Sequence, residues 1–102
     1  GVCHLMPQDA DDTEIALYVY TLYLMAFALY SGENADGALF YTVAMHSAKK
    51  STLPHTTSVR IYRMCALNVA SCVHDYNIED ASSTLLILCI LTTRVATSLD
   101  LT

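Results

Sequence analysis

The sequence predicts an all-α fold, with residues 1–102 forming one domain, an antiparallel up-down-up-down bundle of four helices. Three observations support this fold. Apolar side chains recur at alternating spacings of three and four residues, as on one face of a helix. The long apolar segments contain no proline and, apart from Gly37, no glycine, and the connections between them are short, so that consecutive helices are antiparallel neighbours. The chain is 54% apolar and 15% charged, which is typical of a compact domain rather than a disordered one.

The first helix is predicted at 12–31. Asp11 followed three residues later by Glu14 has the spacing of a capping box. Gly32 can adopt the left-handed conformation that closes a helix. One set of apolar positions on this helix has the spacing of a bundle seam and forms its predicted core face: Ile15, Tyr18, Leu22, Met25 and Leu29.

The second helix is predicted at 35–50. Asn34 can cap its start, and Lys49 and Lys50 suit the partial negative charge of its C-terminal end. Pro54 then interrupts the chain, because the residue before a proline disfavours the helical conformation.

The third helix is predicted at 57–76, with Thr56 or Thr57 as its N-cap. Its core face repeats the seam spacing of the first helix. The residues of that face are Tyr62, Cys65, Val69, Cys72 and Tyr76.

The fourth helix is predicted at 78–99, with Asn77 as its N-cap and Glu79 and Asp80 in its first turn. Its core face is predicted to contain Leu85, Leu88, Thr92, Val95 and Leu99. The β-branched and aromatic content of YVYTLY and LLILCILTT also permits strands. The length of the uninterrupted segments favours helices.

Residues 20–48 resemble one tetratricopeptide motif, with Leu24, Ala28, Gly32, Tyr41 and Ala44 near the signature positions. A repeat protein would need a second copy after about 34 residues. The third and fourth predicted helices align best with residues 20–48 at an offset larger than this repeat length. This segment is therefore predicted to be a helical hairpin, and no functional residue is assigned from the resemblance.

The first helix is apolar on every side, since residues 15–32 include no charged side chain. A helix of a bundle leaves about a third of its surface in water, so a third apolar face needs a further cover, and exposed apolar patches mark interaction surfaces. We expect a homo-oligomer, with a twofold dimer as its commonest form; the alternative is that the tyrosines lie on the surface of a monomer. The predicted interface consists of Ala16, Val19, Tyr23, Ala26 and Tyr30.

The cysteines suggest a reducing environment. Cys65, Cys72 and Cys89 lie inside apolar helical patterns, where a free cysteine behaves as a small hydrophobic residue. We therefore expect buried free thiols and a cytoplasmic location, with one or two disulfides as the alternative. The first residues lack the pattern of a signal peptide.

Two kinds of partner are disfavoured. The net charge of −5 argues against nucleic acid, which needs a basic surface. The eighteen uncharged residues of 15–32 fall short of the roughly twenty that a membrane span needs. No lysine or arginine flanks them, and their tyrosines would lie inside the bilayer rather than at its interfaces.

No catalytic, cofactor or metal site is predicted. The four histidines are scattered over four segments, and no nucleotide-binding, hydrolase or metalloprotease motif occurs. The charges are arranged at two ends of the bundle. One end places the N-terminal acids, among them Glu14, beside the basic residues of 49–63. The other, which we call the acidic pole, holds Glu33, Asp36, Asp75, Glu79 and Asp80. These acids either stabilise helix ends or receive a cation or a basic partner.

The predicted function is a non-enzymatic interaction or scaffold domain that self-associates through its first helix. One alternative is a binder of a small apolar ligand between the first and third helices, where bundles hold their cavities. A second alternative is an enzyme whose residues meet only in three dimensions. An artificial bundle with no biological role would share these features, although helices rich in Thr and Tyr depart from design practice.

Overall fold

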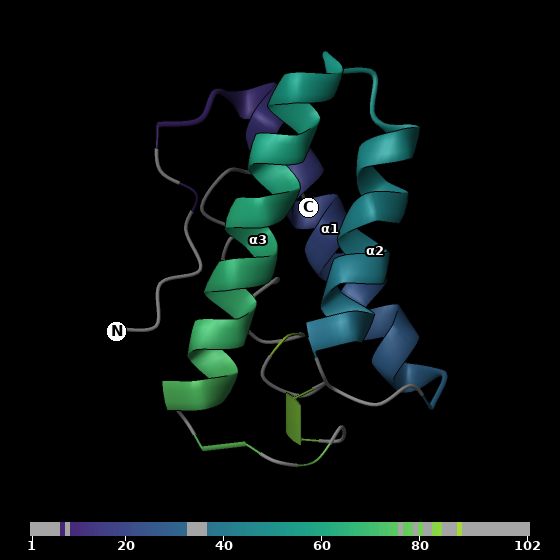
Figure 1. Cartoon of the computed structure of the whole chain (residues 1–102), viewed down its shortest axis with the longest axis vertical. Helices are drawn as coiled ribbons and strands as arrows, with labels where there is room; N and C mark the ends of the chain where they lie inside the picture. The colour runs from purple at the N-terminus through teal and green to yellow at the C-terminus, as the bar shows by residue number, and fades with distance from the viewer. Residues whose placement is uncertain are drawn as a thin grey trace.

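The described part of the chain forms an antiparallel arrangement of three helices (Figure 1). They are α1 (Asp12–Tyr30), α2 (Gly37–Lys50) and α3 (His55–Asp75). Each helix packs against the other two. The computed structural model contains no strand in the part of the chain that it describes. It describes residues 7, 9–32, 37–75, 77, 78, 80, 83, 84 and 88, with side chains for all of these except 37–41.

The start and end of α1 follow from its sequence. The predicted capping box is confirmed: the Asp11 carboxylate accepts a hydrogen bond from the Glu14 N–H at 2.9 Å, and the Asp11 N–H donates to Glu14 Oε1 at 3.1 Å. At the other end, Gly32 has a φ of +95° and its N–H donates to the Leu29 carbonyl at 3.0 Å. Glycine is suited to this left-handed position because it has no Cβ.

The predicted N-cap of α3 is wrong. The helix begins at His55, before Thr56 and Thr57, and the carbonyl of Pro54 accepts its first hydrogen bond from the Ser58 N–H at 2.9 Å. A proline fits at the start of a helix because the first turn leaves its N–H groups unpaired in any case.

Asn77 ends α3 and is not the N-cap that the sequence predicted. Its φ is +52°, its N–H donates to the His74 carbonyl, and the Ile78 N–H donates to the Val73 carbonyl, both at 3.0 Å. This is the Schellman arrangement that terminates helices, whereas an N-cap is usually extended. The capping role belongs to Asp80, whose carboxylate accepts the Ser83 N–H at 2.8 Å.

The prediction of a four-helix bundle is also wrong, because the described residues form three helices. Ser83, Thr84 and Leu88 are helical, and Thr84 and Leu88 are buried; the rest of the helix predicted at 78–99 lies outside the described residues, apart from Ile78 and Asp80. The prediction counted every uninterrupted apolar segment as a helix of a bundle. The three described helices pack against one another, and Leu88 joins their core.

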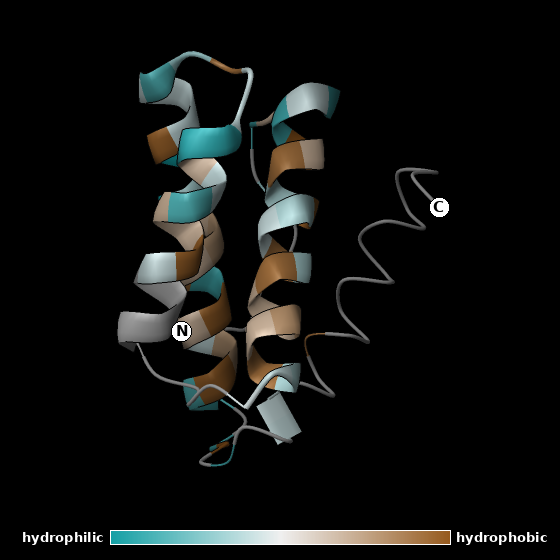
Figure 2. Ribbon diagram, turned by 90° about the vertical axis from the view of Figure 1, so that its right-hand side faces the viewer, coloured by the Kyte–Doolittle hydropathy of each residue, from teal (hydrophilic) through white to brown (hydrophobic). Residues whose placement is uncertain are grey.

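The core lies between the three helices. The predicted core face of α1 is confirmed, since none of its residues is more than 9% exposed: Ile15, Tyr18, Leu22, Met25 and Leu29. On α3, Tyr62, Cys65, Val69 and Cys72 are buried as predicted, and Tyr76 lies outside the described residues. Helix α2 contributes Val43 and the small residues Ala44 and Ala48 to the core, and Leu88 belongs to it as well. Apolar and polar residues alternate along the helices (Figure 2).

Candidate functional site

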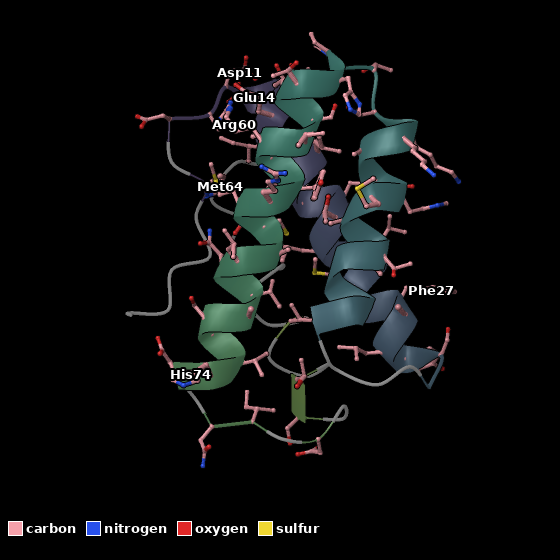
Figure 3. All side chains as sticks on the ribbon, viewed as in Figure 1. Asp11, Glu14, Phe27, Arg60, Met64 and His74 are labelled. Atoms are coloured by element: carbon pink, nitrogen blue, oxygen red, sulfur yellow. The ribbon has the colours of Figure 1, made fainter. Side chains whose placement is uncertain are left out.

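One face of α1 exposes aromatic side chains to solvent. Tyr20, Tyr23, Phe27 and Tyr30 are 40, 50, 67 and 78% exposed. With the exposed Ala16 they follow one another at spacings of four, three, four and three residues, the spacing of a helix–helix seam. We call these five residues the aromatic stripe. Figure 3 shows Phe27 on the outer side of α1, away from α3.

The aromatic stripe differs from the predicted interface in two positions. Ala16, Tyr23 and Tyr30 are exposed, as an interface requires, but Val19 and Ala26 are only 5 and 8% exposed and belong to the core. At 3.6 residues per turn, these two lie roughly 60–80° around the helix from the centre of the stripe. Sequence reasoning missed Tyr20 and Phe27 as exposed residues. The recurrence of aromatic residues at 20, 23, 27 and 30 places them on one face of the helix, but it does not show that this face is the exposed one.

A hollow of about 230 Å³ adjoins the N-terminal half of the aromatic stripe. It lies between the first turns of α1 and the connection from α2 to α3. Ala16 and Tyr20 belong both to its wall and to the stripe. The other residues that line it are Thr13, Leu17, Lys50, Ser51, Thr52 and Leu53.

An ion pair joins the start of α1 to α3. Glu14 Oε2 pairs with the guanidinium of Arg60, while Glu14 Oε1 is engaged in the capping box. The Glu14 side chain is 11% exposed and that of Arg60 is 47% exposed. Figure 3 shows Asp11, Glu14 and Arg60 together at this end of the molecule. The contact confirms that the N-terminal acids lie beside the basic part of the chain.

The described residues of the acidic pole do not form a metal site. Asp75 and Asp80 are exposed, whereas Glu33, Asp36 and Glu79 lie outside the described residues. The carboxylate oxygen Oδ1 of Asp75 lies 3.7 Å from Nδ1 of His74. The hydrogen bonds that Asp80 accepts from Ser83 lower the pKa of its carboxyl group, which gives Asp80 a structural role. Within the described ranges, no three His, Cys, Asp or Glu side chains come together as metal ligands.

The two described cysteines differ in chemical state. Cys65 is a free, fully buried thiol, and burial raises its pKa. Cys72 is also buried, but it is disulfide-bonded, so the expectation of a free thiol at this position is wrong. Its partner cysteine lies outside the described residues. An apolar sequence pattern predicts burial, but it does not distinguish a thiol from a disulfide, which depends on the distance between two cysteines in the fold.

Thiol titration tests this difference. In denaturant without a reducing agent, we expect two thiols per chain to react with a thiol reagent, Cys65 and the cysteine outside the disulfide. After reduction, all four should react. In the native protein Cys65 should not react, because reaction requires an accessible thiolate. Four reactive thiols in the unreduced, unfolded protein would show that Cys72 is free.

The alternative prediction of an apolar-ligand site between the first and third helices concerns the interior around Tyr18, which is filled by protein side chains. Tyr18 is fully buried, its hydroxyl accepts a hydrogen bond from Asn68 Nδ2 at 3.0 Å, and burial raises its pKa. Leu22, Ile61 and Cys65 are also fully buried in this core. The polar end of Tyr18 is therefore satisfied by the protein itself.

Helix α1 is long and apolar enough to cross a membrane, by length and composition alone. More than half of its apolar window is buried inside the fold, and Glu14 in its first turn is ion-paired to α3. These contacts are typical of the core helix of a globular domain.

Comparisons with known proteins give no family for this chain. No protein-family model, no curated protein and no solved structure matches it. The resemblance of residues 20–48 to a tetratricopeptide motif therefore gains no support from them.

Proposed function

We propose that this chain is a non-enzymatic interaction domain that forms a homodimer through the aromatic stripe of α1. The observation that carries this proposal is the exposure of four aromatic side chains, between 40 and 78%, along one face of a single helix. Their spacing is that of a seam between two helices.

The area of the stripe supports an interaction surface. An aromatic side chain can bury about 150–250 Å², so the exposed fractions correspond to roughly 500 Å² of aromatic surface. Apolar patches of this size on a monomer often have a function. Tyrosine suits a surface that is alternately wet and covered, because its ring is apolar and its hydroxyl is polar.

The charge pattern favours a second copy of the same chain as the partner. In a twofold interface the same surface of each copy meets its equivalent, and a charged residue near the axis would therefore approach an identical charge. The stripe has no charged side chain anywhere between Ala16 and Tyr30. Two copies of the stripe can therefore face each other without bringing like charges together.

Sedimentation of the wild type and of Tyr23→Glu tests the proposal. We expect the wild type to have twice the mass of one chain. Tyr23→Glu should have the mass of one chain and keep the helical circular dichroism signal, because Tyr23 is half exposed and a charge near the twofold axis is left unpaired in the dimer.

The matched control is Leu67→Glu on α3. Leu67 is 68% exposed and lies outside the stripe, so this variant should remain dimeric. A wild type that is monomeric at every concentration, or a Tyr23→Glu variant with unchanged mass, would contradict the proposed function.

A further inference from the structure

We infer that the two α1 helices of this dimer pair antiparallel, with Tyr30 of each copy inserted into the hollow beside Ala16 of the other. This inference rests on the proposed homodimer and adds the orientation of its subunits and the residue that each copy contributes to the other. The occupant of the hollow is therefore a tyrosine of a second copy of this chain.

The two ends of the stripe lie at equal distances from its middle residue. Ala16 lies seven residues before Tyr23, and Tyr30 lies seven residues after it, which is about 10 Å along the helix in either direction. If two copies cross antiparallel at Tyr23, Tyr30 of each copy comes opposite Ala16 of the other. In the same arrangement Tyr20, three residues before Tyr23, lies one residue away from the position opposite Phe27, which is four residues after Tyr23.

The sizes of these opposed positions match. Tyr30 is the most exposed of the exposed large apolar residues, at 78%, and it faces the smallest residue of the stripe. The hollow at Ala16 has a volume of about 230 Å³, and a cavity of about 150 Å³ is sufficient for benzene. A tyrosine ring therefore fits.

The chemistry of the hollow also suits tyrosine. Leu17 and Leu53 supply apolar surface to its wall, whereas Thr13, Ser51 and Thr52 supply hydroxyl groups. A tyrosine placed there buries its ring against the apolar side chains and has hydrogen-bond partners for its hydroxyl within reach. Lys50, at the edge of the same hollow, can interact with the face of the ring.

The charges at the two ends of α1 favour the antiparallel orientation. The last turn of α1 has no basic residue, and the C-terminal end of a helix carries a partial negative charge. The antiparallel arrangement brings Lys50 of the other copy to this end. A parallel arrangement would instead bring the exposed acids Asp11 and Asp12 of both copies together, where they repel.

A charge-reversal experiment tests the orientation. Ala16→Glu and Tyr30→Lys, each alone, should raise the dissociation constant of the dimer by at least roughly tenfold, because each buries an unpaired charge in the interface. With both substitutions in one chain, the antiparallel dimer places each introduced glutamate opposite an introduced lysine. We expect the double variant to recover most of the lost affinity.

The outcomes separate this inference from the proposed function. A monomeric wild type contradicts both. If the wild type is a dimer that Tyr23→Glu dissociates, but the double variant binds more weakly than either single variant, the homodimer stands and the antiparallel pairing is wrong. Leu67→Lys on α3 is the matched control and should not change the dissociation constant.

Cross-linking gives a second readout that does not depend on charge. Ala16→Cys and Tyr30→Cys proteins are mixed and oxidised, and the disulfide-linked peptides are identified by mass spectrometry. A link between positions 16 and 30 of different copies supports the antiparallel pairing. A link between two copies of position 16 in the Ala16→Cys protein alone overturns it.

Discussion

Replacing Leu22 by glutamate is expected to abolish the cooperative thermal transition of this protein. Leu22 is completely buried on the core face of α1, as are Tyr18 and Met25 above and below it. A carboxylate there loses its hydration without gaining a partner, and the effective penalty for a buried ion is several kcal/mol. That penalty is comparable with the total stability of a domain, about 5–15 kcal/mol. Thermal denaturation followed by circular dichroism measures the effect.

Two further variants serve as controls for the thermal transition of Leu22→Glu. Leu22→Ala should keep a cooperative transition but lose about 2–5 kcal/mol, as large-to-small core substitutions do. Tyr23→Glu changes the neighbouring residue, which is half exposed, and should keep the transition. If Leu22→Glu melts like the wild type, Leu22 is not in the core.

The features of the fold that the sequence predicted correctly are local. The capping box of Asp11 and Glu14 and the left-handed Gly32 each depend on residues within about one turn of each other, and the core face of α1 depends on the spacing of apolar residues along one helix. The number of helices depends on how distant segments pack, and that prediction was wrong. Asn77 shows why: the same residue type can start one helix or end another, and only its backbone conformation shows that it ends α3.

The exposed face of α1 could not be identified from periodicity. A helix that is apolar on all sides has several equivalent stripes, and the positions of α2 and α3 determine which one stays exposed. Val19 and Ala26 became core residues, whereas Tyr20 and Phe27 remained at the surface. The core face could be predicted because its large aliphatic residues are the most favourable ones to bury.

The cysteines show a similar limit. The sequence pattern correctly predicted that Cys65 and Cys72 are buried, but not that Cys72 is disulfide-bonded. A cytoplasmic location stays a prediction. The disulfide argues against it, because disulfides persist mainly in oxidising compartments.

Replacing Glu14 by alanine is expected to give the second large loss of stability, about 1–3 kcal/mol. The substitution removes two interactions at once: the hydrogen bond from the Asp11 N–H at 3.1 Å and the ion pair with Arg60. Loss of a helix cap typically costs about 0.5–2 kcal/mol, and hydrogen bonds to charged groups contribute about 1.5–3 kcal/mol. The loss should stay below the value for a fully buried pair, since Arg60 is 47% exposed and water can solvate it. Urea denaturation measures the change.

Glu14→Gln separates the two interactions. Glutamine keeps an oxygen that can accept the Asp11 N–H, as it does in many capping boxes, but it removes the charge that faces Arg60. We therefore expect Glu14→Gln to lose less stability than Glu14→Ala.

The ion pair itself is measured by combining Glu14→Gln with Arg60→Met in a double-mutant cycle. Asp12→Ala, an exposed acid in the same turn, is the control for the general effect of charge at the helix start, about 0.3–1 kcal/mol. If Arg60→Met destabilises the Glu14→Gln protein as much as the wild type, the two side chains are not coupled, and α1 and α3 are held together by core packing and the Asn68–Tyr18 hydrogen bond.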